Sequence, residues 1–224
     1  MLKRRILAAM ETIWIIGAGQ FGMRAVTSLS RWHKNLKIVL VDQDCEKLDR
    51  ARGMECITVH SDGGAYLETH LKPGNLPDWI VPALPVHLVW EWCLRQLGPE
   101  GLTRVNISFE INGQLPNPMH GSNGDIYVSH ANFICPINCS EPDDICTVTQ
   151  QPRKQEMFKL LAKLRFKDFS SLVIQSHQLA PGLGGYGPEA LFSLLKKIKG
   201  VKGPFLLSTA CRCHGVITGG THKG

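Results

Sequence analysis

The stretch that decides the fold is Thr12-Ile13-Trp14-Ile15-Ile16-Gly17-Ala18-Gly19-Gln20-Phe21-Gly22, an apolar run that leads into three glycines spaced G-x-G-x-x-G. We expect residues 12–16 to form a buried strand and residues 20–29 to form the helix that follows it. A second apolar run, residues 38–41, predicts the next strand and ends in Asp42, twenty residues after Gly22. Strand, glycine turn, helix, strand and terminal acid in this order are typical of a dinucleotide-binding unit.

The chemistry of a bound pyrophosphate explains this spacing. Gly17 permits the tight turn, Gly19 lets the backbone approach the ligand, and Gly22 lets the helix pack closely on the strand. The helix N-terminus supplies free N–H groups and the positive end of its dipole. Asp42 would accept hydrogen bonds from the adenosine ribose and repel a 2′-phosphate, which favours NAD(H) over NADP(H). The predicted cofactor contacts of this unit are Gly17, Gly19, Gln20, Phe21, Gly22 and Asp42.

The rest of the first half alternates between strand and helix patterns. Further strands are expected at 56–59, 78–81 and 104–111, and further helices at 45–52, 64–71 and 86–97. This rhythm predicts the α/β class, with a doubly wound, mainly parallel Rossmann-type sheet and a Cys-rich loop insert. Ligands of such sheets bind beyond the carboxyl ends of the strands, which adds Ala83 to the predicted cofactor contacts.

Three segments are expected. Residues 1–111 form the dinucleotide-binding half, and residues 112–152 form an insert rich in Cys, Pro and Gly. Residues 153–224 form a basic α/β half that is expected to complete the same sheet. Its expected elements are a helix at 155–166, a strand at 171–175, a helix at 188–198, a strand at 204–208 and a loose tail at 219–224.

The first 85 or so residues resemble the regulatory NAD-binding domains of potassium-uptake systems, and Rossmann dehydrogenases more generally. The resemblance is carried by the glycine turn, by Asp42 and by Val59-His60-Ser61-Asp62 followed by Leu67. The family has an acid after its third strand that lies near the adenosine, which implies that Asp62 contacts the cofactor. Residues 81–85 depart from the regulatory pattern, so the resemblance implies the fold and the nucleotide and not a role in transport.

Five of the eight cysteines fall into two clusters. Metal binding would explain how a segment without regular structure is ordered. Four ligands are usual for zinc and for iron–sulfur clusters, but the spacing matches neither a zinc ribbon nor a ferredoxin. A cluster beside NAD(H) would offer a route for electrons, zinc stays open, and redox-active or inert buried thiols are the alternatives. The candidate ligands are Cys135, Cys139 and Cys146 in the insert, with Cys211, Cys213 or the adjacent His214 near the C-terminus.

The candidate catalytic residues are two histidines and a tyrosine. His87 follows the fourth predicted strand, near the expected position of a nicotinamide ring. His177 lies just before a glycine-rich segment, residues 179–187, and Tyr186 lies within it; the two could form an acid–base pair. The sequence contains no Walker loop and no H-E-x-x-H motif to support hydrolysis.

The charge of the chain is uneven. The net charge is +6, but residues 151–224 carry 12 Lys and Arg against 3 Asp and Glu, whereas residues 1–150 carry 13 against 16. Few aromatic residues accompany the basic ones, which disfavours nucleic-acid binding. No apolar run of about 18 residues is present, so no membrane span is expected. Residues 1–10 begin like a signal peptide, but Glu11 and the first strand interrupt the pattern, and a cytoplasmic protein is predicted.

The leading hypothesis is an NAD(H)-binding oxidoreductase with a cysteine-ligated metal or iron–sulfur centre near the nucleotide crevice. One alternative is a non-catalytic sensor, in which NAD(H) changes how the basic half meets a partner. Another is a metal-dependent nucleic-acid-binding protein. Besides the dinucleotide, the leading hypothesis requires a small-molecule or protein redox partner that the sequence does not identify. The sequence leaves the oligomeric state open and is compatible with a homo-oligomer.

Overall fold

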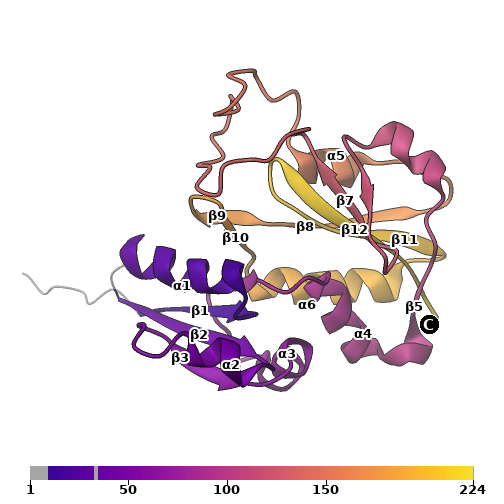
Figure 1. Ribbon diagram of the computed structural model, residues 1–224. Helices are drawn as coiled ribbons and strands as arrows, with labels where there is room; N and C mark the ends of the chain where they lie inside the picture. Colours follow the sequence, from indigo (N-terminus) through magenta and orange to yellow (C-terminus); the bar gives the residue numbers. More distant parts are fainter. Residues whose placement is uncertain (1–9, 33–34, 224) are drawn as a thin grey trace, which may run out of the picture.

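Figure 1 shows the computed structural model, which describes residues 10–32 and 35–223. The interpretation of the N-terminus as unlike a signal peptide concerns mainly residues 1–9, which lie outside the described residues, as does the end of the predicted tail at Gly224. Within the described residues, no helix is long and apolar enough to cross a membrane.

The N-terminal part is a parallel sheet in the order β3-β2-β1-β4, flanked by helices. This arrangement confirms the α/β class and the Rossmann-type sheet that the glycine motif predicted. In the sheet, β1 pairs with β2 on one side and with β4 on the other. The elements are β1 (Glu11–Ile16), α1 (Gln20–Trp32), β2 (Leu36–Asp42), α2 (Cys45–Asp49), β3 (Ile57–His60), α3 (Gly63–His70) and β4 (Trp79–Pro82).

Strand β1 shows why this sheet has helices on both faces. Successive side chains of a strand point to opposite faces. Ile13 and Ile15 pack in one cluster with Val26 of α1, whereas Trp14 and Ile16 pack in another with side chains of α3. All four β1 side chains are buried, as expected for a parallel sheet covered on both sides.

The C-terminal half forms a mixed sheet of its own, in the order β6-β7-β12-β11-β8, with β5 also paired to β12. The prediction that this half completes the first sheet is therefore wrong. The elements are α4 (Leu88–Gly101), β5 (Leu102–Arg104), η1 (Phe109–Gln114), β6 (Met119–His120), β7 (Ile126–Ser129), α5 (Met157–Lys163), β8 (Ser170–Gln175), β9 (His177–Ala180), β10 (Leu183–Gly185), α6 (Pro188–Gly200), β11 (Pro204–Ala210) and β12 (His214–His222).

Two further local predictions are corrected. The strand expected at 104–111 ends at Arg104, because Ser108 caps the 3₁₀ helix η1 by accepting a hydrogen bond from Glu110 N. The tail expected from residue 219 is part of β12. A Cβ at Gly219 would lie 2.3 Å from Val105 O, so the glycines that suggested a loose tail instead allow close packing.

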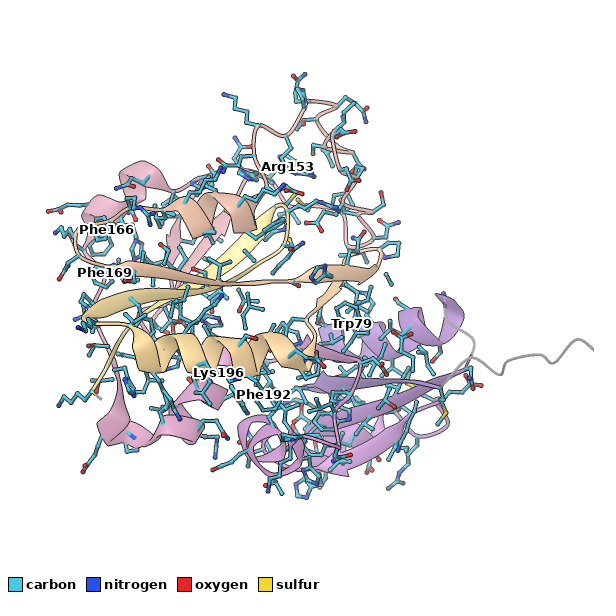
Figure 2. The ribbon with its side chains drawn as sticks, turned by 180° about the vertical axis from the view of Figure 1, so that it is seen from behind. Trp79, Arg153, Phe166, Phe169, Phe192 and Lys196 are labelled. Atoms are coloured by element: carbon cyan, nitrogen blue, oxygen red, sulfur yellow. The ribbon has the colours of Figure 1, made fainter. Side chains whose placement is uncertain are left out.

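Helices α4 and α6 join the two sheets through one core. Trp90 and Trp92 of α4 are buried in a hydrophobic cluster that includes side chains from one face of each sheet. Phe192 of α6, labelled in Figure 2, meets the Trp92 ring edge-on, with centroids 5.9 Å apart. Figure 1 shows α6 along one face of the mixed sheet and α5 on the other. The two sheets are thus held in a fixed relation, and a cavity can be shared between them.

Candidate functional site

A cavity of about 1140 Å³ opens where the two sheets meet. Phe21 of α1 and Pro82 at the end of β4 line it from the N-terminal sheet, and Thr209 of β11 lines it from the mixed sheet. Much of its remaining wall comes from residues 130–156, the segment between β7 and α5, which we call the cysteine loop, and further parts come from the β9–β10 hairpin and the turn between β11 and β12. The point between β1 and β4, where the strand order reverses, is where ligands of such sheets bind. The cavity therefore begins at the expected place.

The glycine turn has the shape that the motif requires. Gly17 has a φ of +115°, and a Cβ there would lie 2.5 Å from Ala83 O. A Cβ at Gly22 would lie 1.9 Å from Gly17 O, whereas one at Gly19 would meet nothing within 4 Å. Gly17 and Gly22 are thus needed by the fold itself. Gly19 leaves open space beside the backbone, and Gln20 next to it is exposed.

The two acidic residues predicted to contact the cofactor, Asp42 and Asp62, both form hydrogen bonds with other residues of the protein. Asp42 is 5% exposed, and its carboxylate accepts hydrogen bonds from Ala18 N (2.6 Å) and Asp44 N (2.9 Å). Asp62 caps α3 by accepting from Ala65 N and forms an ion pair with Arg95 at 2.8 Å. Asp42 thus fastens the glycine turn to the end of β2, and Asp62 fastens α3 to α4.

All five clustered cysteines line the cavity, and so does His214; we call these six residues the cysteine wall. Cys135 Sγ lies 3.7 Å from His214 Nε2, and Cys211 Sγ lies 3.9 Å from His214 Nδ1. Cys211 Sγ also accepts hydrogen bonds from the backbone N–H groups of Cys213 and His214. Among the described residues, however, no group of three or more His, Cys, Asp or Glu side chains is arranged to hold a metal ion. The fold gathers the predicted ligands without closing them around one point.

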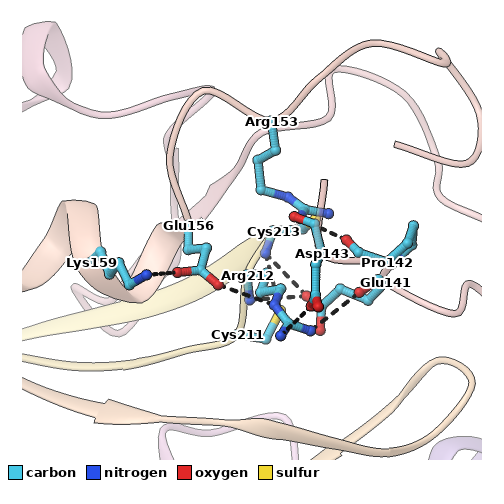
Figure 3. A network of polar contacts seen from close by, with 9 residues as sticks. All are labelled: Glu141, Pro142, Asp143, Arg153, Glu156, Lys159, Cys211, Arg212 and Cys213. Atoms are coloured by element: carbon cyan, nitrogen blue, oxygen red, sulfur yellow. Dashed lines mark hydrogen bonds and ion pairs between the residues drawn. The ribbon is translucent and has the colours of Figure 1, made fainter. Parts of the chain in front are cut away.

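The cysteine loop is clamped to the turn between β11 and β12, as Figure 3 shows. Glu141 Oε1 accepts hydrogen bonds from the backbone N–H groups of Arg212 (3.0 Å) and Cys213 (3.1 Å). The Arg212 guanidinium pairs with Glu156 and Asp143. Within the loop, Arg153 donates to the carbonyl oxygens of residues 142 and 143. This network orders the loop through hydrogen bonds and charge.

A second attachment links the cysteine loop to α1. Cys139 O accepts hydrogen bonds from Gln178 Nε2 and Gly182 N, both at 2.8 Å. The Arg24 guanidinium of α1 donates to Gly182 O at 3.3 Å. Gly182 has a φ of +71°, and a Cβ there would lie 1.9 Å from Ile137 O. The turn between β9 and β10 therefore connects the helix of the glycine turn to the cysteine wall.

The thiols of this wall differ in acidity. Burial raises the pKa of the Cys211 thiol to about 12, and Glu141 beside it acts in the same direction. Burial also raises the pKa values of Cys135 and Cys213. Hydrogen bonds from Thr149 lower the pKa of Cys146. Cys146 is therefore a more acidic thiol than Cys135, Cys211 or Cys213.

His87 also lines the cavity; it is 3% exposed and lies at the start of α4. Its Nδ1 lies 2.7 Å from Thr218 Oγ1, and its Nε2 lies 2.9 Å from Thr209 Oγ1. Thr218 donates its hydroxyl proton to Asp125, which is fully buried and paired with Arg104 at 2.7 Å. Burial lowers the pKa of His87 to about 4. His87 is thus a neutral histidine near physiological pH.

The two other catalytic candidates lie on or next to the β9–β10 hairpin, where Gly185 pairs with His177, but their side chains do not interact as an acid–base pair. His177 is exposed on β9, with its ring 5.7 Å from that of Trp79. Tyr186 is 1% exposed in the core, and its hydroxyl has no hydrogen-bond partner in the part of the chain that the structure describes. Burial raises the pKa of Tyr186, so its hydroxyl stays protonated. The predicted acid–base pair is not formed in this structure.

Sequence reasoning missed the residues that surround His87. Thr209 and Thr218 lie on paired strands, and Asp125 precedes β7 in a segment that was interpreted as an insert. None of the three belongs to a motif. Only the pairing of β12 with both β11 and β7 brings them together. Glu141 was likewise missed, because its partners are backbone groups more than 70 residues away.

Comparison with known proteins gives a family and a relative. Residues 89–223 match the family model AF_1314_C, described as an uncharacterized protein's C-terminal domain. An uncharacterized protein of Archaeoglobus fulgidus is 30% identical over 215 residues, which cover 91% of this chain and 96% of the relative. The matched family region contains the whole cysteine loop, His214 and the threonines around His87. The chain therefore belongs to the AF_1314_C family, with a Rossmann-like parallel sheet in front of the domain that defines it.

Proposed function

We propose that this protein is an NAD(H)-binding oxidoreductase that works in the cavity between its two sheets. The observation that carries the proposal is the continuity of that cavity. It runs from the carboxyl end of the parallel sheet to the cysteine wall, with His87 and Thr209 along it. In a Rossmann-type sheet the nucleotide crosses the point where the strand order reverses. A dinucleotide held at the glycine turn could therefore extend past Leu84 into the cavity.

The residues of the turn fit such a ligand in part. The space beside Gly19 would admit a pyrophosphate, and Leu84 both contacts the turn and lines the cavity. Asp42 lies beside the turn, where an acidic side chain would repel a 2′-phosphate and so favour NAD(H) over NADP(H), but its oxygens already accept backbone hydrogen bonds. We therefore give Asp42 the role of holding the turn in shape, and ribose binding would use its remaining lone pairs. A bound nicotinamide would supply hydride transfer, and the protein would orient it.

We propose further that the cysteine wall binds zinc or an iron–sulfur cluster. The support is the chemistry of the side chains, since thiolates and imidazole suit both kinds of centre. The separation of 3.7 Å between Cys135 Sγ and His214 Nε2 is about that of two ligands of one tetrahedral zinc. The arrangement of the whole set does not fit, because the described side chains do not surround a common point. No step of the proposed reaction depends on this centre.

Calorimetric titration with NAD⁺, NADH and NADP⁺ tests the nucleotide proposal. Gly19→Ala is the diagnostic variant, because its Cβ meets nothing within 4 Å in the protein but would fill the space for a pyrophosphate. Gly113→Ala is the matched control, since a Cβ there also meets nothing. We expect NAD(H) to bind the wild type and the control alike, and at least tenfold more weakly to Gly19→Ala. Equal binding to all three proteins, or none to the wild type, would refute the proposal.

Metal analysis with a visible spectrum of protein purified without oxygen tests the cysteine wall. Iron with sulfide indicates a cluster, and zinc without colour indicates a zinc centre. Two Cys→Ser variants show whether the metal is bound by the cysteine wall or by a cysteine outside it. We expect Cys135→Ser to lose metal and Cys45→Ser, which is exposed on α2, to retain it. Protein with neither metal would refute this part and leave the nucleotide proposal standing.

A further inference from the structure

We propose that Thr209, His87, Thr218 and Asp125 form a proton-transfer chain, with Thr209 Oγ1 as its cavity end and the acceptor of a proton from an alcohol substrate. Thr209 would touch the substrate, His87 would take up the proton that Thr209 passes on, and Thr218 and Asp125 would position and polarise the His87 ring. The hydrogen bonds of this chain are formed by the protein's own side chains and do not require a bound nucleotide. Its use in oxidising an alcohol rests on the proposed function, which supplies NAD⁺.

The donor and acceptor in each hydrogen bond of the proton-transfer chain can be assigned by starting from its buried end, Asp125. Asp125 is fully buried, and its two oxygens accept hydrogen bonds from the side chains of Arg104 and Asn123, both at 2.7 Å, so Asp125 is the acceptor at the buried end of the chain. Thr218 has one hydroxyl proton and donates it to Asp125. The Thr218 oxygen, 2.7 Å from His87 Nδ1, must therefore accept, and Nδ1 must carry the ring proton.

The remaining step fixes the role of Thr209. A neutral imidazole protonated at Nδ1 has a bare Nε2, which can only accept. Burial keeps the His87 ring neutral, with a pKa of about 4; the nearby Asp125 charge opposes this shift and Arg104 adds to it. Thr209, 2.9 Å away, therefore donates its proton to Nε2 and keeps its lone pairs free. Thr209 is half-buried and lines the cavity, so those lone pairs are available to a ligand there.

This arrangement suits the removal of a proton from a hydroxyl group. As the substrate carbon gives its hydride to NAD⁺, the substrate O–H bond breaks and its proton passes to Thr209 Oγ1. The original Thr209 proton moves to His87 Nε2, and the carbonyl product and NADH remain. The positive charge that develops on the ring is offset by Asp125 through one intervening hydroxyl. In the reverse direction, the charged ring returns the proton through Thr209 to a carbonyl oxygen.

The first test measures the chain without any nucleotide. ¹⁵N NMR of histidine-labelled protein reports the protonation of each ring nitrogen, with His87 assigned by comparison with His87→Gln. We expect a neutral ring at pH 7 with the proton on Nδ1. In Thr209→Val the Nε2 resonance should shift because its donor is lost, whereas Thr209→Ser should restore it. In Thr218→Val the proton should move to Nε2, since Nδ1–H has lost its acceptor. A charged ring, or a wild-type proton on Nε2, would overturn the chain.

The second test measures turnover. A panel of small aliphatic and aromatic alcohols is offered with NAD⁺, and NADH formation is followed by absorbance. General acid–base groups contribute about 10²–10⁴-fold to rate, so Thr209→Val should lower kcat by that factor while NAD⁺ binding is unchanged. Thr209→Ser should retain most of the activity. Turnover in Thr209→Val within threefold of the wild type would overturn the role of Thr209, and a wild type that oxidises none of the alcohols would overturn the substrate class. A protein that binds no NAD⁺ refutes the proposed function instead, and the NMR result then decides the chain alone.

Discussion

Acid should destabilise this protein partly through His87, and the size of the effect can be worked out. The His87 ring is buried, and its pKa falls from 6.5 to about 4. The unfolded chain therefore takes up a proton at a pH where the folded chain does not, and stability is lost as the pH falls below 6.5. With these two pKa values, the contribution to the free energy of unfolding drops by about 1.2 kcal/mol between pH 7 and 5.5 and by about 3 kcal/mol by pH 4.

Urea unfolding of wild type and His87→Gln at several pH values measures this loss. His130 and His214 also have pKa values lowered by burial and act in the same direction, but both are present in each protein and cancel in the difference. We expect His87→Gln to be less stable than the wild type at pH 7, because Thr209 and Thr218 lose a partner, and the gap to narrow by about 3 kcal/mol toward pH 4. Parallel curves over this range would refute a neutral, buried His87.

Three further changes test the attachments around the cavity. Gly22→Ala should lower the free energy of unfolding by about 1–3 kcal/mol in urea, because its Cβ would lie 1.9 Å from a backbone oxygen; unchanged stability would contradict the close packing of the glycine turn. Glu141→Ala leaves two backbone N–H groups without their acceptor and should cost about 1–3 kcal/mol, with faster hydrogen exchange confined to the cysteine loop; exchange unchanged there would show that the clamp is unimportant. Gly182→Ala forces its Cβ to 1.9 Å from Ile137 O, so we expect faster labelling of the loop thiols by iodoacetamide, and equal rates would argue against this attachment.

The parallel sheet could be predicted from sequence because its information is local. The apolar run, the glycine turn and the terminal acid of the first βαβ unit lie within about thirty consecutive residues. Buried parallel strands appear as continuous apolar runs, and each of them is followed by a helix pattern. The structure has every strand and helix that the sequence predicted between residues 12 and 81. The resemblance to NAD-binding domains therefore described the fold of this part correctly.

The mixed sheet could not be predicted because its order depends on distant pairings. β12 is glycine-rich, which suggested a tail, yet it is flanked by β11 on one side and by β5 and β7 on the other. Gly219 and Gly220 are needed there because Val105 and the Trp90 ring approach their backbone. A glycine-rich sequence suggests a disordered tail, but in β12 the absence of side chains on these glycines allows neighbouring groups to pack closely against the strand. The two cysteine clusters line one cavity, and the metal centre that the sequence predicts for them stays a prediction.

The register of β11 and β12 links the cysteine wall to the chain around His87. Thr209 pairs with Val216, and Leu207 pairs with Thr218, so these side chains share the sheet face that is turned toward α4. A slip of one residue would turn Thr218 to the opposite face and remove it from His87. The turn that fixes this register contains Cys211 and Cys213, and Glu141 holds it from the cysteine loop. Any ligand that binds these cysteines therefore acts on the same hairpin that positions Thr209. The chemistry proposed for the cysteine wall and the proton transfer proposed for Thr209 would thus depend on one structural element.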